Sequence, residues 1–478
     1  MQAARGKLGH VVEVAVIGGG IAGLSTAWEL LRAGARVTVL ESTDRVGGKL
    51  RTESIAGSMV DVGAESMLGR RPETRALVAE LGLDVVAPAM LGAAVWSRGE
   101  MQPMPRGTLM GVPSDAAGLR GLLSDDEVER AAQEQPVEFD GDDISVGDAV
   151  EQAFGPAVVD RLVEPLLGGV YAGDARYLSL RACVPQLYDV VREGRSLQEA
   201  AAAASRFQAT PAAATGDEPP VFAGLRGGIG TLPQIMVDRL EAGGARVRTG
   251  VTVTGLEPDE RGWMLRQGDG EAQRFDGVVV ATPGPAAARL LEASAPTAAQ
   301  LLRSIEYASM AVITYAFPGS VRAQLPEQSG FLVPPLDGRR IKASTFSSLK
   351  WPWLGQQRPD LVYARVSMGR FRDAEALQRP DAVLAADGLR ELREAVGELP
   401  APVAVNVKRW GGGLPQYATG HVDLVARIRD EVASLPRISV AGAAYDGVGI
   451  PACIGSGRAA ARAVHEQLIP SDSRQGRS

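Results

Sequence analysis

The 478-residue chain is predicted to be an α/β protein in which one open-sheet domain is assembled from separated segments. An inserted α+β domain and a helical subdomain interrupt that assembly. Three observations predict this arrangement. First, strand–turn–helix patterns occur at the start of the chain, at residues 222–282 and at residues 438–468. Second, strand-like runs occur within residues 310–368. Third, residues 108–180 show helical periodicity.

The first element is an apolar strand, residues 11–17, which runs into a glycine-rich turn, residues 18–23. Helical residues 24–33 and a second strand, residues 36–40, follow. This order is typical of a Rossmann-like dinucleotide site, where glycines let a pyrophosphate approach the start of a helix. The residues expected to hold the pyrophosphate are Gly18, Gly19, Gly20, Ile21, Ala22 and Gly23.

An acidic residue, Glu41, ends the second strand, and Ser42 follows it. A carboxylate at this place can accept hydrogen bonds from both ribose hydroxyls of an adenine dinucleotide. It would also repel a 2′-phosphate, which argues against NADP. The unit alone does not distinguish NAD from FAD.

The composition is that of an ordinary globular protein, with 45% hydrophobic and 22% charged residues. The net charge of −7 indicates no nucleic-acid partner. Two cysteines, Cys183 and Cys453, and three scattered histidines suggest neither a disulfide framework nor a metal site. The sequence shows no signal peptide and no apolar stretch long enough for a membrane span, so a cytoplasmic protein is expected that is soluble or, through residues 108–180, at most peripheral to a membrane.

Changes of pattern divide the rest of the chain. Residues 72–82 are expected to form an amphipathic helix, residues 84–106 short strands, and the low-complexity residues 194–220 a linker. The predicted boundaries are 11–83, 221–300 and 408–468 for the nucleotide-binding domain, 84–107 and 301–407 for the inserted substrate domain, 108–220 for the helical subdomain and linker, and 469–478 for a disordered tail.

Two further turns resemble those of the FAD-containing amine oxidase superfamily. Residues 45–49 read Arg-Val-Gly-Gly-Lys, and residues 441–454 lead from a strand through glycines into a helix that begins at Pro451. In that superfamily the first of these turns carries the chain past the pyrophosphate, and the second helix start faces the pyrimidine end of the flavin. The resemblance implies FAD as the cofactor.

Further segments resemble the protoporphyrinogen/coproporphyrinogen oxidase family, in its soluble, Gram-positive, coproporphyrin-forming type. They are residues 162–174, 224–232, 276–283, 342–353 and 408–421. The resemblance implies a six-electron oxidation of coproporphyrinogen III to coproporphyrin III in haem biosynthesis, with O2 as acceptor and H2O2 as by-product. It also implies ferrochelatase and coproheme decarboxylase as transient partners.

The resemblance carries over to individual residues. Arg45, Gly48 and Lys49 would lie along the pyrophosphate and flavin, and Val253 would offer its backbone to the adenine. The residues that would border the flavin ring are Gly63, Ala64, Glu65, Ser66, Trp410, Val448, Gly449 and Ile450. No catalytic side chain is assigned, because the flavin carries the chemistry. The cations expected to bind substrate propionates are Arg70, Arg71, Arg106 and Lys350, with Arg365 as a further candidate.

Several alternatives remain open from the sequence. Protoporphyrinogen IX is a second candidate substrate. A flavin amine oxidase or carotenoid desaturase would share the fold, and so would a binding protein without flavin, such as a GDP-dissociation inhibitor. The oligomeric state and the choice among the arginines are also left open.

Overall fold

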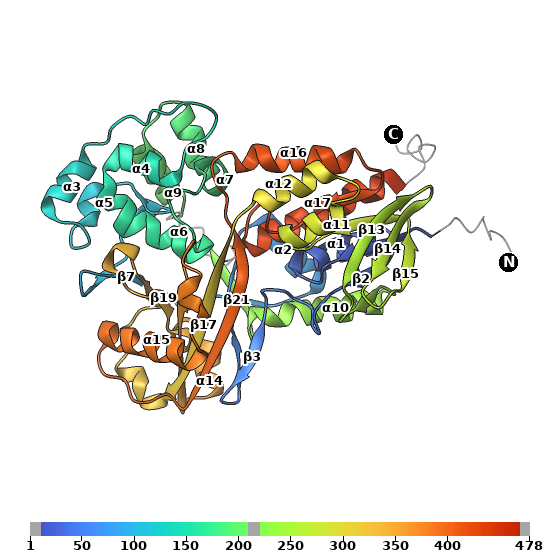
Figure 1. Ribbon diagram of the computed structural model, residues 1–478. Coiled ribbons are helices and arrows are strands. Elements are labelled where there is room, and N and C mark those ends of the chain that lie inside the picture. Colours follow the sequence, from blue (N-terminus) through green and yellow to red (C-terminus); the bar gives the residue numbers. More distant parts are fainter. Residues whose placement is uncertain (1–10, 209–219, 469–478) are drawn as a thin grey trace, which may run out of the picture.

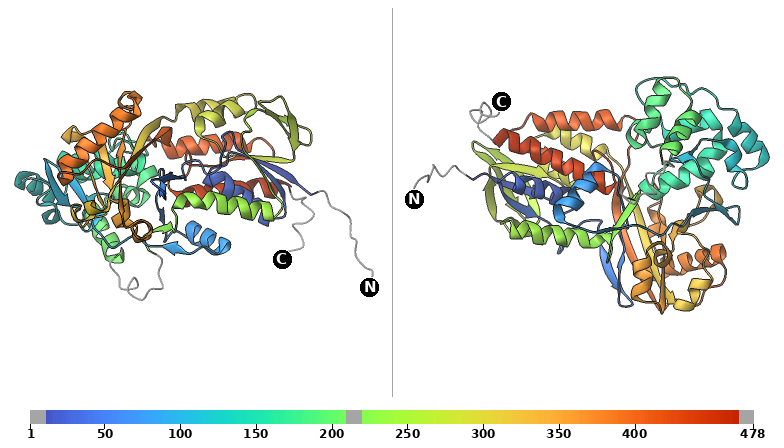
Figure 2. Two further views of the ribbon diagram at one scale, coloured as in Figure 1. Left: turned by 90° about the horizontal axis from the view of Figure 1, so that it is seen from below. Right: turned by 180° about the vertical axis from the view of Figure 1, so that it is seen from behind.

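The computed structural model describes residues 11–208 and 220–468, which form three bodies (Figure 1). The nucleotide-binding domain lies at one end, and the sheet-containing inserted domain and the helical subdomain lie beside each other at the other end, as the further views also show (Figure 2). The predicted α/β class is confirmed by the mixture of parallel and antiparallel sheets. The predicted tail at 469–478 and residues 209–219 of the predicted linker lie outside the described residues.

A parallel five-stranded sheet is the middle layer of the nucleotide-binding domain. Its strands, in spatial order, are β12 (Arg246–Arg248), β2 (Arg36–Leu40), β1 (Glu13–Ile17), β16 (Gly277–Val280) and β22 (Ile438–Val440). Successive residues of β1 point to opposite faces of the sheet: Val14 and Val16 join one apolar cluster, and Ala15 and Ile17 join the other. Both faces are therefore covered, as a parallel sheet requires.

Helices make up most of the two covering layers. One layer holds α1 (Ile21–Arg32), α2 (Pro72–Leu81), α10 (Leu232–Ala242), η4 (Ile229–Thr231) and α17 (Ile450–Leu468). The other layer holds α11 (Gly284–Leu291), α12 (Pro296–Ser304), α16 (His421–Ala433) and the antiparallel strands β13 (Val253–Asp259), β14 (Gly262–Gln267) and β15 (Ala272–Phe275). The carboxyl ends of β1 and β16 and the first turn of α1 thus lie at one edge, where open α/β sheets bind nucleotides.

The inserted domain is built on a seven-stranded sheet. Its strands, in spatial order, are β21 (Ala404–Pro415), β17 (Tyr307–Pro318), β20 (Leu361–Met368), β19 (Ile341–Thr345), β18 (Gly330–Leu332), β7 (Ala93–Ser97) and β8 (Glu100–Pro103). The helix α15 (Asp381–Val396) packs on one face. The inserted domain also contains five short helical segments: η5 (Gly319–Ala323), η6 (Pro335–Asp337), α13 (Ser347–Lys350), α14 (Pro352–Gln357) and η7 (Glu375–Gln378).

The other face of this sheet meets the nucleotide-binding domain. The hairpin β3 (Thr52–Ile55) and β4 (Ser58–Asp61) packs there against Tyr363 and Trp351. A small three-stranded sheet follows, formed in spatial order by β5 (Met67–Leu68), β11 (Phe222–Leu225) and β6 (Val85–Val86). The segment between β4 and β5 therefore runs along the junction of the two domains.

The helical subdomain has its own apolar core. It contains β9 (Thr108–Leu109), β10 (Val112–Pro113), η1 (Ala116–Leu119), α3 (Asp125–Ala132), α4 (Val146–Phe154), α5 (Pro156–Val158), the π-helical turn η2 (Val159–Val163), α6 (Glu164–Tyr171), α7 (Leu180–Cys183), α8 (Pro185–Arg192) and α9 (Leu197–Gln208). Ser124 and Glu127 form a reciprocal capping box at the start of α3, which the pattern of a serine followed three residues later by a glutamate signals.

Three local expectations differ from the structure. The first helix begins at Ile21 rather than at residue 24, since the last glycine of the turn already belongs to its first helical turn. Residues 197–208 of the predicted linker form α9, because alanine favours helix and Leu197 and Ala201 are buried in the subdomain core. The predicted boundaries at 300/301 and 407/408 fall inside α12 and β21, which continue across them.

Candidate functional site

The first turn, residues 18–23, has the geometry of a phosphate cradle. Gly18 has a φ of 110°, and a Cβ on Gly23 would lie 1.9 Å from the Gly18 oxygen, so both positions require glycine. A Cβ on Gly20 would meet nothing within 4 Å, which leaves room for a ligand. No side chain caps the N-terminus of α1, so its first N–H groups and its dipole are available to an anion.

The acidic residue predicted to bind ribose lies beside this turn. Glu41 Oε2 accepts a hydrogen bond from the Gly19 N–H at 2.7 Å, and its Oε1 accepts from the Thr43 N–H at 2.8 Å. Val251 N–H donates to the Glu41 carbonyl at 2.9 Å, which brings the start of β13 and Val253 to the same edge. The structure thus gathers the predicted ribose and adenine residues, with the exposed Ser42 next to them.

The second turn, residues 45–49, is joined to the first. Gly47 N–H donates to the Gly19 carbonyl at 2.7 Å. Arg45 donates to the carbonyls of Val46 at 2.9 Å and Gly48 at 2.6 Å, so its guanidinium closes its own turn. Burial lowers the pKa of Arg45, as does the charge of Arg51. Arg45 therefore supports the cofactor site by shaping the turn.

Lys49 is a buried cation. Burial lowers the pKa of its ammonium, and within the described chain no hydrogen bond or ion pair compensates its charge. A buried ammonium without a partner is costly, so the position fits a ligand that carries negative charge. Cys453, from the start of α17, lies close to it, and burial raises the pKa of that thiol to about 11.

Residues 63–66 and Trp410 lie against the second turn. Ala64 N–H donates to the Lys49 carbonyl at 3.1 Å, and a Cβ on Gly63 would lie 2.1 Å from that same carbonyl oxygen. Trp410 Nε1 donates to the Val62 carbonyl at 3.0 Å. Cys453, in the third turn at residues 441–454, influences the pKa of Lys49, so the third turn lies near the second.

Two side chains that no site assignment included support the third turn. Tyr417 donates its hydroxyl to the Ala443 carbonyl, and His421 stacks on the Tyr417 ring at a centroid distance of 4.1 Å. Burial lowers the pKa of His421 to about 4, so its imidazole is neutral at pH 7. Both residues lie in segment 408–421, and the resemblance of that segment to the porphyrinogen oxidase family is the only feature of the sequence that points to them.

These features fit FAD. Two helix starts, an open glycine and an unpaired buried ammonium converge where an adenine dinucleotide requires N–H donors and positive charge. The carboxylate of Glu41 lies beside the first turn, and its contact with ribose stays a prediction.

The expected propionate cations do not form one cluster. Lys350 and Arg365 both lie at Glu65, with Nζ–Oε2 and Nη2–Oε2 distances of 3.8 Å and 2.5 Å. Arg71 pairs with Glu73 at 3.0 Å on the surface, immediately after Arg70. Arg106 is exposed and shows no ion pair with the described residues.

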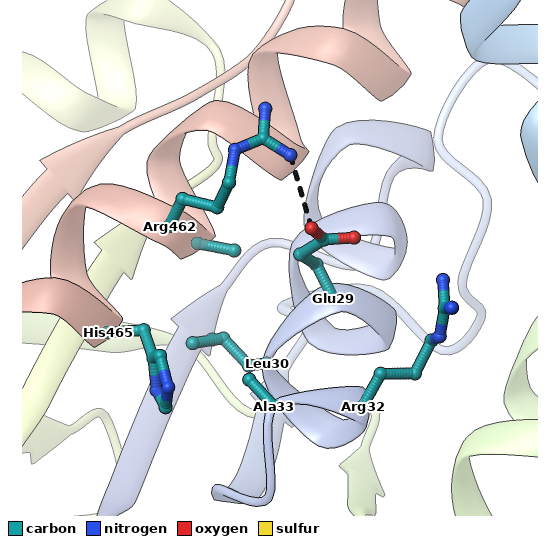
Figure 3. Close-up of a pocket in the computed structure, with 7 residues that line it drawn as sticks. Glu29, Leu30, Arg32, Ala33, Arg462 and His465 are labelled. Atoms are coloured by element: carbon teal, nitrogen blue, oxygen red, sulfur yellow. Dashed lines mark hydrogen bonds and ion pairs between the residues drawn. The ribbon is translucent and has the colours of Figure 1, made fainter. Parts of the chain in front are cut away.

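Two hollows open on the nucleotide-binding domain. One, of about 280 Å³, opens between the C-terminal half of α1 and α17 (Figure 3) and is lined by Glu29, Arg462 and His465. Arg462 pairs there with Glu29 at 3.1 Å. It lies at the end of α1 opposite the first turn, so it is not part of the cofactor site. The other, of about 390 Å³, lies between the second turn and α10.

The fold and the three turns define a dinucleotide-binding flavoprotein. The model of the flavin containing amine oxidoreductases matches residues 21–465, and the chain belongs to this family. It is therefore an FAD-dependent oxidase.

Individual relatives are similar over nearly the whole chain. The chain is 40% identical to a coproporphyrinogen III oxidase of Mycobacterium tuberculosis, over 95% of this chain and 97% of that protein. It is 32% identical to a coproporphyrinogen III oxidase of Bacillus subtilis, over 94% of this chain and 97% of that protein. A crystal structure from Exiguobacterium sp. 255-15, provisionally assigned as a protoporphyrinogen oxidase, superposes with a TM-score of 0.83 at 28% identity, covering 96% of this chain and all of that one.

Helix composition adds one finding about membranes. Within residues 11–208 and 220–468, no helix combines the length and the apolarity that crossing a membrane requires.

Proposed function

We propose that this protein oxidises coproporphyrinogen III to coproporphyrin III, with O2 as the final acceptor and H2O2 as the by-product. The observation that carries the proposal is the similarity to coproporphyrinogen III oxidases along 95% of the chain, which includes the inserted domain and the helical subdomain. A shared fold would not by itself indicate this substrate, because one fold can serve many activities.

In this proposal the three turns bind the FAD. The free N–H groups at the starts of α1 and α17 and the ammonium of Lys49 are placed to neutralise the pyrophosphate and the flavin edge. Bound FAD supplies the electron acceptor for each two-electron oxidation. Residues 63–66 and Trp410 are proposed to border the flavin ring, because they pack against the second turn.

The substrate carries four propionates, and the chain must meet them with cations. We assign Arg70, Arg71 and Arg106 to this role, with Lys350 nearest to the flavin segment. The surface pair of Arg71 with Glu73 is weak enough to exchange for a propionate. A guanidinium binds a carboxylate through two parallel hydrogen bonds, so each assigned arginine would orient the macrocycle as well as attract it.

The proposal also places the reaction in a sequence. Coproporphyrin III is a metal-free macrocycle that still bears its propionates, so an iron insertion by ferrochelatase and a decarboxylation by coproheme decarboxylase would follow. We expect these enzymes as transient partners in the cytoplasm.

The test is a fluorescence assay of porphyrin formation with coproporphyrinogen III and with protoporphyrinogen IX, at equal enzyme and O2 concentrations. We expect a higher kcat/KM with coproporphyrinogen III. A higher value with protoporphyrinogen IX would instead make that compound the substrate. Oxygen consumption with a diamine and none with either porphyrinogen would establish an amine oxidase, and a colourless protein that takes up no FAD would establish a binding protein.

The propionate assignment has its own test. Replacing Arg106 by Ala should raise KM about tenfold while changing kcat little, because the contact is made equally in the ground state and the transition state. Arg120→Ala, which removes another exposed arginine of the same region, is the matched control and should leave KM unchanged. An unchanged KM in the Arg106 variant would remove this residue from the substrate site.

A further inference from the structure

The segment between β4 and β5 is tied to the inserted domain by its backbone oxygens. Arg365 Nη1, from β20, donates to the carbonyls of Asp61 at 3.3 Å and Gly63 at 3.2 Å. Trp410 Nε1, from β21, donates to the intervening Val62 carbonyl at 3.0 Å. Three consecutive carbonyls therefore accept from the sheet of the inserted domain, immediately before the residues proposed to border the flavin.

A buried charge cluster reinforces this contact. Glu65 is almost completely buried, and its Oε2 lies 2.5 Å from Arg365 Nη2 and 3.8 Å from Lys350 Nζ. Trp351 Nε1 donates to its other oxygen. Burial alone would raise the pKa of Glu65, but the charges of Arg365 and Lys350 outweigh it and hold the pKa below its usual value. The carboxylate is therefore ionised.

The two cations of the cluster are not equivalent. Both terminal nitrogens of Arg365 are engaged by protein oxygens, so a propionate could bind it only by displacing them. Lys350 lies farther from Glu65 and pairs with it weakly. Arg365 is the closer of the two cations to Glu65, and its charge also interacts with the Asp61 carboxyl. The positive charge left for a ligand resides on Lys350.

We propose that Arg365 is a positioning residue for FAD and not a substrate cation: with Glu65 it holds residues 61–66 in the shape that borders the flavin, and it couples that shape to the sheet of the inserted domain. This inference rests on the proposed contact of residues 63–66 with the flavin.

The experiment compares Arg365→Gln, Glu65→Gln and the double variant with the unchanged protein. The measurements are the FAD dissociation constant of the reconstituted apoprotein, the visible absorption spectrum of the bound flavin, and KM for coproporphyrinogen III. We expect Arg365→Gln to weaken FAD binding about tenfold or more, since two charge-assisted hydrogen bonds to backbone carbonyls and the ion pair with Glu65 are lost. The flavin spectrum should shift, and KM should change less than the FAD affinity.

The double variant should bind FAD more tightly than Arg365→Gln alone, because removing both charges avoids leaving Glu65 buried without its partner. Arg365→Lys keeps the charge but cannot reach Glu65 and both carbonyls together, so it should give an intermediate affinity. If Arg365→Gln does not fold, the FAD affinity of Arg365→Lys tests the proposal in its place.

Two controls separate this role from others. Arg358 likewise bridges a backbone carbonyl, that of Ala56, and a carboxylate, that of Asp360, at the far end of the β3–β4 hairpin. Arg358→Gln should leave FAD affinity and the flavin spectrum unchanged. Lys350→Gln should raise KM and leave FAD affinity nearly unchanged.

The proposal is overturned if Arg365→Gln raises KM while FAD affinity and spectrum stay the same, or if Arg358→Gln weakens FAD binding as much. Because FAD affinity is measured without substrate, failure of the porphyrinogen assignment would leave this test intact.

Discussion

Lys342 should destabilise the folded protein in a pH-dependent way, and replacing it by Met should remove that penalty. The side chain extends from β19 into the contact with α6, where its ammonium is buried and donates to the Gly168 carbonyl at 3.2 Å. Burial lowers the pKa of Lys342 from the usual 10.5 to about 7, and the nearby charge of Arg370 acts in the same direction. Glu164, which also interacts with the charge of Arg370, has a pKa that burial raises to about 7.

The sign and size follow from proton linkage. Below about pH 7 the amine is charged in both the folded and the unfolded state, and the folded state bears the full cost of a buried charge. Between about pH 7 and 10.5 only the unfolded state keeps the proton, so the cost falls as pH rises. The pKa difference corresponds to at most about 5 kcal/mol, and losing the bond to Gly168 subtracts about 1 kcal/mol from the gain in any Met variant.

We therefore expect Lys342→Met to raise the free energy of unfolding by about 2–4 kcal/mol near neutral pH, with a gain that shrinks by about 1 kcal/mol per pH unit above it. Urea denaturation of both proteins at several pH values between about 6.5 and 9.5 measures this directly. Lys408→Met is the matched control, because its ammonium lies 3.3 Å from Glu53 and its removal should give no such gain. A gain from Lys342→Met that does not depend on pH would refute the reasoning.

Two further predictions concern the turns. Gly23→Ala should abolish tight FAD binding, measured as flavin content after purification, because the added Cβ would collide with a backbone oxygen of the first turn at 1.9 Å; Gly118→Ala, where a Cβ meets nothing within 4 Å, should retain the flavin. Tyr417→Phe should lower the free energy of unfolding by about 1 kcal/mol and speed FAD release, since a carbonyl of the third turn loses its donor. Tyr188→Phe loses a comparable bond within the helical subdomain and should release FAD at the normal rate.

Local signals made the nucleotide-binding elements predictable. The first strand, turn and helix follow from glycines and periodicity within about thirty residues, and the structure differs only in where the strand begins and where the helix begins and ends. The α9 helix was missed because its stability comes partly from burial against the helical core, which alanine-rich sequence does not reveal.

The charge cluster at Glu65 could not be predicted from the sequence, for a different reason. In the sequence, Arg365 is one more arginine that could bind a propionate. Only the packing of β20 against the segment after β4 shows that the terminal nitrogens of Arg365 already bind oxygens of the protein. The predicted boundary at 407/408 falls inside β21, because a strand that pairs with β17 from Ala404 to Pro415 carries no signal where one domain passes to the next.

The parts of the sequence that resemble porphyrinogen oxidases are far apart in the chain, and the structure shows why they belong together. Gln416 donates to the Tyr171 carbonyl at 2.8 Å, which joins segment 408–421 to segment 162–174 of the helical subdomain. The next residue, Tyr417, donates to the third turn and packs edge-on against the Tyr171 ring at a centroid distance of 5.6 Å. A change in the helical subdomain can therefore reach the turn at the flavin through two adjacent residues. The glycine turn at the start of the chain indicates an adenine dinucleotide, whereas this junction connects the third turn to the helical subdomain.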